Sequence, residues 1–420
     1  MRTKVIITIF SIAILGLNVS MAQETQRQKT IKSKLEYLAS DQLEGRAPAS
    51  TGDSLAIDFI VKSFKKIGLR PAFINEQGAS YVQKTNFSIP IYNVSGVLDI
   101  KDNNLKTSKS KYIVLGAHYD HLGMGGEKSG SRRPDTLAVH NGADDNASGV
   151  SGMIAIAEHF AKIKGANKIV FVAFGGEEKG LVGSKYFADN LPVAKEDVLA
   201  MINFDMIGSL RGNSLMVGGI GSAQEFDGLV GNVNKSFGSK NGQVYDYFKL
   251  TLSQQGYGPS DHSSFYIKGI PVLYLTTGAT ETYHTPQDDA CNINYLGIDS
   301  VVNFSIELIN RLSTFDSLTY KESEAPATMP VKKQFKVTLG IMPDVVGTTE
   351  RGMKADVVIK DRPAYKAGLK SGDVIIKMNE MDIANIEDYM KALSSIKEEN
   401  DLNIKVIRDG KELLFVVKFK

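Results

Sequence analysis

The stretch from Lys168 to Glu178 reads Lys-Ile-Val-Phe-Val-Ala-Phe-Gly-Gly-Glu-Glu, a short apolar run followed by two glycines and two carboxylates. Such an unbroken apolar run predicts a strand that is buried on both faces of a sheet. Similar runs recur along the chain, and segments with the apolar spacing of helices lie around them. The predicted strands are 112–116, 168–174, 199–204 and 271–276, and the predicted helices are 54–67, 146–164, 181–190 and 298–312. This alternation predicts an α/β fold in which a mostly parallel (mixed) central sheet is sandwiched by helices.

The composition limits the classes of function. The chain has 420 residues, of which 42% are hydrophobic and 23% charged, and its net charge is +2. A globular protein of two or three domains fits these values, and the balanced charge argues against nucleic acid as a partner. The one cysteine, Cys291, excludes an intramolecular disulfide and a multi-thiolate zinc site. A metal site would therefore have to use the six histidines and the carboxylates.

The N-terminus has the pattern of an export signal. Arg2 and Lys4 precede an almost wholly apolar run over 5–17, and Ser20-Met-Ala22 supplies small residues before a cleavage point. We expect a signal peptide over residues 1–22 and a periplasmic or extracellular protein, with an uncleaved N-terminal anchor as the alternative. No later run reaches the ~18 apolar residues that a membrane span requires.

A polar segment with two prolines divides the rest of the chain. It covers 320–330 and lacks any periodicity, which is typical of a linker. We expect a large body over residues 23–316, a linker over 317–333 and a small C-terminal module over 334–420.

Side chains that can bind metal follow every predicted strand of the body, and others stand at the start of the helix predicted at 146–164. Because ligands bind beyond the carboxyl ends of the strands in such sheets, we expect these segments to converge on one edge. In chain order the residues are His118, Asp120, Asp144, Asp145, Glu177, Glu178, Asp205 and His284.

The spacing within these segments suggests separate tasks. His118 and Asp120 point the same way on an extended chain, so the Asp120 carboxylate can accept the proton of the second His118 nitrogen. Glu177 and Glu178 point opposite ways, so one can bind metal while the other acts as a base. Each motif alone also has an ordinary explanation as a core histidine, a solvated acidic turn or a helix cap. Which of the two adjacent aspartates is the ligand stays open.

The other histidines carry weaker signals. We expect His121 either to contact the ligands from behind or to lie in a loop, His140 to line the mouth of the site, and His159 to lie on the surface. For His262, a place in a substrate pocket and an ordinary buried position are equally open.

Two histidines and three carboxylates are too many for one tetrahedral zinc with an open position. They suit two ions roughly 3.5 Å apart that share one carboxylate and a water or hydroxide. Nitrogen and oxygen donors favour zinc, although manganese and cobalt stay open.

The motifs, in this order, resemble those of the dizinc exopeptidases, which include bacterial leucyl aminopeptidases, glutamate carboxypeptidases and glutaminyl cyclases. The resemblance covers about residues 35–312. It rests on the stretch 37–46, His118-Tyr-Asp120, the stretch 142–149, Glu177-Glu178, the stretch 203–208 and His284-Thr-Pro286. It implies a phosphorylase/hydrolase-like exopeptidase fold, two Zn²⁺ per chain and peptide substrates.

The resemblance also implies the metal ligands. His118 and Asp205 would hold one ion, Glu178 and His284 the other, and Asp145 would bridge the two.

By the same resemblance, three further residues would take part in the reaction. Glu177 would be the general base, Asp120 would be the partner of His118, and Tyr283 would stabilise the oxyanion.

The C-terminal module resembles a PDZ domain, a small β-sandwich or barrel with helices. Leu339-Gly340-Ile341 matches the loop that receives a peptide carboxylate, 363–375 matches the helix–turn–strand signature, and 387–394 would be the helix beside the groove. This resemblance implies that a peptide or the C-terminus of a protein adds to the sheet edge. The alternative is a module that packs on the body and binds nothing.

Together these features favour an exported zinc aminopeptidase that removes N-terminal residues from peptides. Three alternatives remain: a glutaminyl cyclase-like acyltransferase with a single zinc, a receptor-like relative without metal, and a carboxypeptidase or dipeptidase of the same family. The presence of both His118 and Asp205 argues against the first, and the complete ligand set argues against the second.

Overall fold

The computed structural model describes residues 24–99, 111–127, 129–163, 168–237, 239–240, 243–244, 246–323, 337–343, 349, 351–397 and 399–419. The predicted signal peptide over 1–22 and residues 324–333 of the predicted linker lie outside the described residues.

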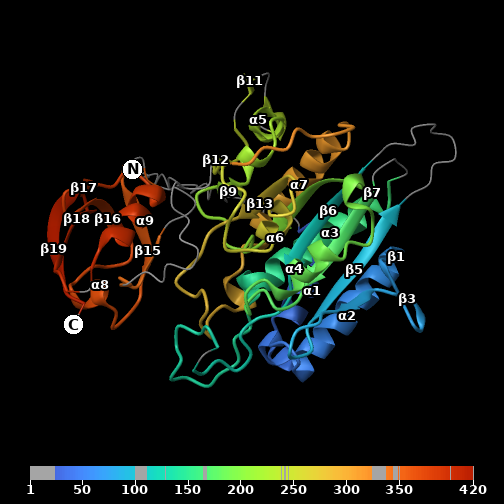
Figure 1. Cartoon of the computed structure of the whole chain (residues 1–420), viewed down its shortest axis with the longest axis horizontal. Helices are drawn as coiled ribbons and strands as arrows, with labels where there is room; N and C mark the ends of the chain where they lie inside the picture. Colours follow the sequence, from blue (N-terminus) through green and yellow to red (C-terminus); the bar gives the residue numbers. More distant parts are fainter. Residues whose placement is uncertain are drawn as a thin grey trace, which may run out of the picture.

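A mixed sheet forms the centre of the body (Figure 1). Among the described residues its strands are β1 (Arg70–Pro71), β4 (Val82–Lys84), β5 (Tyr92–Asp99), β6 (Tyr112–His118), β7 (Lys168–Phe174), β8 (Val198–Phe204), β9 (Ser214–Gly218), β12 (Lys249–Leu252) and β13 (Val272–Thr276). Their order is β1-β5-β7-β6-β8-β13-β9-β12, with β4 beside β5. The four predicted strands form a parallel centre, and antiparallel pairs flank it. The prediction of a mostly parallel, mixed sheet is confirmed.

Successive side chains of the central strands point to opposite faces of the sheet, and each face packs into its own apolar core. Ile113 and Leu115 belong to one core, whereas Tyr112 and Val114 belong to the other. Burying one such aliphatic side chain contributes about 1.5–3 kcal/mol, so both faces hold their helices firmly. Helices on the first face are α1 (Gln26–Leu38), α2 (Thr51–Ile67), α3 (Gly149–Phe160), α5 (Phe226–Phe237) and α7 (Tyr295–Leu312). On the second face lie α4 (Val182–Asp189) and α6 (His262–Tyr266).

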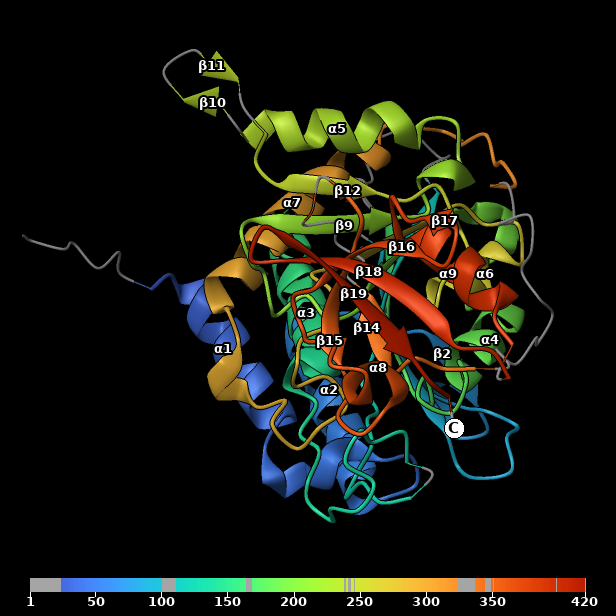
Figure 2. The same ribbon diagram turned by 90° about the vertical axis from the view of Figure 1, so that its left-hand side faces the viewer.

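The edges of the body carry smaller elements. Figure 2 shows α5 beside β12 at one edge of the sheet. Two short hairpins lie apart from the sheet, β2 (Phe73–Asn75) with β3 (Gly78–Ser80) and β10 (Ser239–Lys240) with β11 (Gln243–Val244).

The predicted helices form, but one begins later than expected. The helix expected from residue 146 begins at Gly149, because Ala143–Ser148 forms a π-helical turn in which Asp145 and Asn146 leave helical geometry. The Asn146 side chain accounts for this late start. Its Oδ1 accepts the Gly149 N–H at 2.9 Å, and its amide donates to the Phe204 carbonyl at 2.9 Å. Such side-chain bonds compete with the helical backbone bonds.

The first half of the predicted linker is fastened to the body. Tyr320 pairs with Ala223 and donates to the Tyr266 carbonyl at 3.2 Å. The Ser323 hydroxyl contacts the Tyr266 hydroxyl at 2.9 Å. Tyr320 and Ser323 of the predicted linker therefore contact the body, and the boundary at residue 316 stays a prediction.

The C-terminal module has its own antiparallel sheet and its own apolar core. Its strands are β14 (Ile341–Pro343), β15 (Met353–Val358), β16 (Val374–Met378), β17 (Met381–Asp382), β18 (Leu402–Arg408) and β19 (Lys411–Val417), and its helices are α8 (Pro363–Lys366) and α9 (Ile386–Ser395). The order β14-β15-β16-β18-β19 leaves β14 at an edge.

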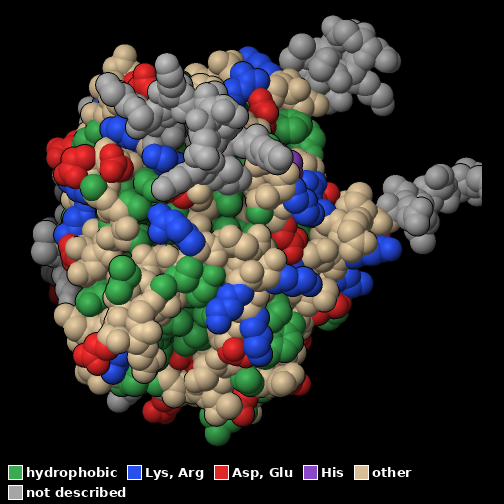
Figure 3. Space-filling model, turned by 90° about the vertical axis from the view of Figure 1, so that its right-hand side faces the viewer, with side chains coloured by type: hydrophobic (Ala, Val, Ile, Leu, Met, Phe, Trp, Pro, Cys, Tyr) green, Lys and Arg blue, Asp and Glu red, His purple; other side chains and the backbone are tan. Residues whose placement is uncertain are grey.

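Two observations concern the outer surface. Among the described residues, no helix combines the length and the apolar character needed to cross a membrane. On the face shown in Figure 3, basic and acidic side chains are interspersed, which agrees with the balanced net charge.

Gly52 allows α2 to approach the 3₁₀ segment Asp41–Arg46, and its replacement tests this packing. A Cβ at Gly52 would lie 1.7 Å from the Leu43 carbonyl oxygen. We therefore expect Gly52→Ala to lower the free energy of unfolding of the body by about 1–3 kcal/mol or more. In contrast, Gly228→Ala in α5 meets open space and should be neutral or stabilising by about 0.5–1 kcal/mol. Urea unfolding followed by circular dichroism measures both variants, and equal effects would contradict the packing argument.

Candidate metal centre

The metal-type residues of the body meet at the carboxyl edge of the parallel strands. They are His118 at the end of β6, Glu178 after β7, Asp205 after β8, His284 after β13 and Asp145 in the turn Ala143–Ser148. The structure thus brings together the segments that the sequence predicts to converge, and the donor atoms form two adjoining clusters.

The first cluster surrounds His118. Its Nε2 lies 3.2 Å from Asp145 Oδ1 and 3.3 Å from Asp205 Oδ1. These three donor atoms come from two strand ends and from the π-helical turn, and all three side chains are buried.

The second cluster uses the other oxygen of Asp145. His284 Nε2 lies 3.1 Å from Asp145 Oδ2 and 3.2 Å from Glu178 Oε1. Asp145 is therefore the carboxylate that the two clusters share. Asp144 instead accepts the Gly208 N–H at 2.7 Å, so its carboxylate is engaged away from the two clusters.

The spacing of the donor atoms fits metal ions. The nitrogen–oxygen separations in the two clusters run from 3.1 to 3.3 Å. A tetrahedral zinc with bonds of about 2.0–2.1 Å would hold its ligands about 3.3 Å apart. Imidazole nitrogens and carboxylate oxygens are also donors that zinc accepts. Three buried carboxylates at such short range need a cation to offset their repulsion.

The electrostatics of the second cluster agree with this assignment. Burial and the nearby Asp145 carboxylate oppose ionisation of Glu178, but hydrogen bonds from His121 and His284 lower its pKa to about 2. Burial likewise opposes the charge on His284, yet contacts with Asp145 and Glu178 raise its pKa to about 11. The pocket therefore strongly favours positive charge at this point.

Glu177 has different surroundings from its neighbour. Burial raises its pKa well above the ordinary value; His118 opposes the shift, and the carboxylates of Asp261, Asp205 and Glu178 add to it. A carboxyl group with a raised pKa can both take up and release a proton near neutral pH.

Asp120 differs from the prediction in the atom that it presents to His118. The backbone carbonyl of Asp120 faces His118 Nδ1 at 3.2 Å, whereas its carboxylate lies 3.9 Å from that nitrogen, too far for a hydrogen bond. The carboxylate Oδ1 instead accepts the backbone N–H of Glu177 at 3.0 Å. Asp120 thus links the ring of the first histidine to the backbone of the candidate base.

The remaining predicted residues, Tyr283, His262 and His140, are each held by a contact with a neighbouring side chain. The Tyr283 ring stacks on His284 at a centroid distance of 3.8 Å, and burial together with nearby carboxylates raises its pKa well above the ordinary value. His262 stacks on Tyr274 at 4.5 Å, and burial lowers its pKa to about 3, so its ring is neutral. His140 is buried and holds the Ser131 hydroxyl at 2.7 Å.

Arg46 ties together the backbone segments that carry the site. Its buried guanidinium donates to the carbonyls of Tyr119 at 2.7 Å, Asn141 at 2.6 Å and Gly142 at 3.0 Å, and also to the carbonyl of Leu38. Lysine could not make four such contacts, because it lacks the fixed fork of donors. The sequence includes Arg46 in the stretch 37–46, but nothing in that stretch reveals this role.

Asp288 fixes the turn that presents Asp145. Its two carboxylate oxygens accept the backbone N–H groups of Asp144 and Asp145 at 2.9 and 3.0 Å. Sequence reasoning misses Asp288, because nothing distinguishes it from its neighbour Asp289.

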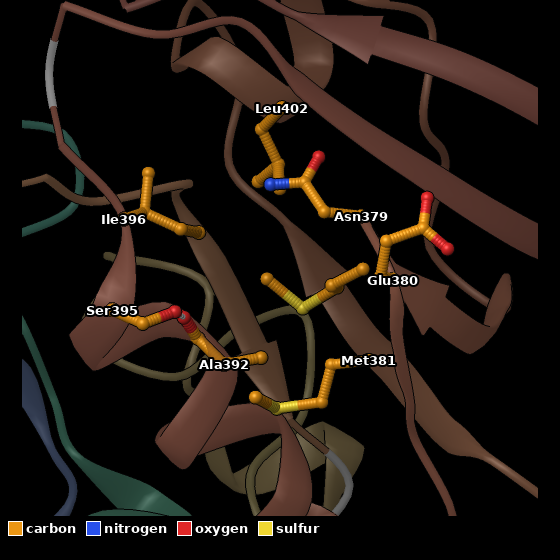
Figure 4. Close-up of a pocket in the computed structure, with 8 residues that line it drawn as sticks. Asn379, Glu380, Met381, Ala392, Ser395, Ile396 and Leu402 are labelled. Carbon is orange, nitrogen blue, oxygen red and sulfur yellow. Dashed lines mark hydrogen bonds between the residues drawn. The ribbon is translucent and has the colours of Figure 1, made fainter.

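In the C-terminal module the predicted carboxylate loop and an apolar pocket lie apart. Gly340 has a left-handed backbone (φ 72°), and Ile341 begins the edge strand β14. A pocket of about 360 Å³ lies between the β16–β17 hairpin and the end of α9 (Figure 4). Its lining includes Met378, Met381 and Ile396, and no residue of the loop 339–341 contributes.

Comparison with known proteins identifies the family. The profile of peptidase family M28 matches residues 97–309, half of the chain, and that of the PDZ domain matches residues 337–419. The chain therefore belongs to peptidase family M28 and carries a PDZ domain.

Individual relatives agree with this placement. An aminopeptidase of Pseudomonas aeruginosa is 30% identical over 210 residues, covering 43% of this chain and 35% of the relative. Aminopeptidase YwaD of Bacillus subtilis is 28% identical over 273 residues, covering 63% of this chain and 53% of the relative. The chain thus spans between a third and about half of the length of these curated relatives.

Solved structures show the same fold. The LapA aminopeptidase of Legionella pneumophila superposes with a TM-score of 0.53 at 20% identity, over 69% of this chain and 72% of that one. At this identity the likeness concerns the fold alone.

Asp288→Asn tests whether the backbone bonds to Asp145 hold the shared carboxylate in place. An amide would set an N–H donor against a backbone N–H, so Asp145 would lose its support. We expect zinc affinity, measured by competition with a coloured chelator, to fall about 10–100-fold, as for other groups that orient ligands. The exposed Asp227→Asn serves as the control and should bind zinc normally. Unchanged affinity of Asp288→Asn would contradict the role given to Asp288.

Proposed function

We propose that this member of family M28 is an exported zinc aminopeptidase that hydrolyses the N-terminal residue from peptides. The observation that carries the proposal is the Asp145 carboxylate, whose two oxygens face different histidines. A carboxylate shared in this way suits a pair of ions that act on one carbonyl group. The relatives named as aminopeptidases support the same reaction.

The proposed ligands follow the two clusters. His118 and Asp205 belong to one zinc ion, Glu178 and His284 to the other, and Asp145 to both. When bound, the two ions polarise the scissile carbonyl and lower the pKa of a water molecule.

Two side chains of the protein carry out the proton transfer and the stabilisation of charge, and a third positions the base. Glu177 takes the proton of the attacking water and delivers it to the leaving amine, which its raised pKa favours. Asp120 holds the backbone of this base through the contact at 3.0 Å. Tyr283 remains protonated because its pKa is raised, and its hydroxyl donates to the oxyanion.

The charge around the base favours a substrate with a free amine. Asp205 and Asp261 act on Glu177 as neighbouring negative groups. Asp261 is fully buried, and burial raises its pKa to about 7. An ammonium group placed among these carboxylates would be stabilised, whereas a peptide C-terminal carboxylate would be repelled. This supports an aminopeptidase over a carboxypeptidase.

The PDZ domain supplies a second peptide-binding site in this proposal. β14 lies at the edge of its sheet, so a peptide or the C-terminus of a protein can extend the sheet there. The loop Leu339-Gly340-Ile341 would receive the terminal carboxylate.

The proposal also covers the export of the protein and the order of its domains. Residues 1–22 direct export to the periplasm or the outside of the cell and are removed. The peptidase body follows over 23–316, and a linker over 317–333, whose first part contacts the body, joins it to the PDZ domain over 334–420.

A panel of substrates tests the proposal. We expect the protein to hydrolyse leucine p-nitroanilide and short peptides with a free amine, to lose this activity with a chelator, and to regain it with zinc. Peptides with an acetylated N-terminus should resist hydrolysis. Release of C-terminal residues from acetylated peptides would show a carboxypeptidase instead. Cyclisation of N-terminal glutamine without hydrolysis, with one zinc per chain, would show an acyltransferase.

Glu177→Gln tests the assignment of the base. The amide keeps the shape of the side chain but cannot accept a proton, so kcat should fall about 10²–10⁴-fold. The zinc content, measured by atomic emission, should stay at the wild-type value. The exposed Glu196→Gln is the matched control and should keep full activity. A Glu177→Gln variant with near-normal kcat would refute the role.

A further inference from the structure

His121 lies three residues beyond His118 and has no part in the proposed mechanism. The residue is 1% exposed. A buried imidazole in this place calls for a chemical partner.

The partner is the second cluster. His121 Nδ1 lies 3.0 Å from Glu178 Oε1 and 3.7 Å from Asp145 Oδ2. These are the same two oxygen atoms that His284 Nε2 contacts at 3.2 and 3.1 Å. Both histidines thus present a ring nitrogen to the same pair of carboxylate oxygens.

The ring of His121 is held in this orientation. Gly142 packs against it so closely that a Cβ there would lie 2.6 Å from its Cγ. The His284 ring meets it edge to face at a centroid distance of 5.6 Å. The backbone N–H of His121 donates to the Arg46 carbonyl at 3.3 Å. The side chain is therefore preorganised before any ligand binds.

We propose that His121 is a fourth protein donor to the ion held by Asp145, Glu178 and His284. This inference rests on the proposed pair of metal ions. It makes the two positions unequal, because the position at His118 has three protein donors and the position at His284 has four. The three-donor position keeps more room for water and substrate. The four-donor position should hold its ion more tightly.

One other arrangement uses the same contact. His121 could donate Nδ1–H to Glu178 and so only orient that carboxylate, as residues behind metal ligands do. A glutamine side chain can donate a similar hydrogen bond but is a poor zinc ligand. Replacement by glutamine therefore separates the two roles.

The experiment is a zinc titration of the full-length protein in competition with chelators of graded affinity. We expect two zinc ions per wild-type chain. In both His121→Ala and His121→Gln, the tighter ion should bind at least about 10-fold more weakly, because a donor is lost. His159→Ala, a histidine of α3 away from both clusters, should match the wild type. Recovery of wild-type affinity in His121→Gln, or normal affinity in His121→Ala, would overturn the inference.

A second measurement needs no variant and so does not depend on the folding of one. In cadmium-loaded protein with isotopically labelled histidine nitrogens, we expect scalar coupling from the metal to Nδ1 of His121 and to Nε2 of His118 and His284. Coupling to only the last two would overturn the inference.

The outcomes remain separate from those for the proposed function. Inactivity toward peptides with two zinc ions bound would refute the aminopeptidase and leave the donor count intact. A wild-type chain that binds one ion would refute the metal pair, and the cadmium coupling would still report whether His121 binds that ion.

Discussion

The close approach of the carboxylates of Asp145, Asp205 and Glu178 is the constraint on which the rest of the body depends. Two of them contact the same His118 nitrogen, and two contact the same His284 nitrogen. Buried charges of one sign carry a penalty of several kcal/mol each unless they are compensated. The protein compensates them with imidazole groups, and a metal pair would do so more completely. The surrounding structure has to hold these groups against their own repulsion.

The backbone provides that resistance. A parallel sheet brings His118, the glutamate pair and Asp205 to one edge, because strands that run the same way end together. Asp145 comes from a turn and not from a strand, and it therefore needs separate support. Asp288 binds the N–H groups of that turn, and Arg46 binds the carbonyls that precede it. Groups that never meet a ligand thus fix the position of the shared carboxylate.

The contrast between ligands at strand ends and a ligand held in a turn by long-range contacts explains what the sequence can predict. Strands such as 168–174 are unbroken apolar runs, so the parallel centre and the ligands at its edge can be inferred. β5 escapes the same reasoning, because it buries Asn93 and Ser95, whose side chains bond to Gly183 and Phe171 carbonyls. The choice of Asp145 over Asp144 depends on a non-helical turn that only three-dimensional contacts stabilise. Asp288 and the contacts of His121 are long-range for the same reason.

The position of Glu177 indicates what the difference between three and four protein donors would do for the reaction. The charge that acts most on Glu177 is that of His118, and the carboxylates of Asp261, Asp205 and Glu178 follow. Because His118 and Asp205 belong to the cluster with three protein donors, the base adjoins that side of the site, where a fourth position would be free for water. The side with His284 and His121 is closer to saturation and is better suited to hold its ion and the shared carboxylate in place. Proton transfer would then take place on one side of Asp145 and structural support on the other. The Asp145 carboxylate, which both clusters share, would fix the distance between the two sides.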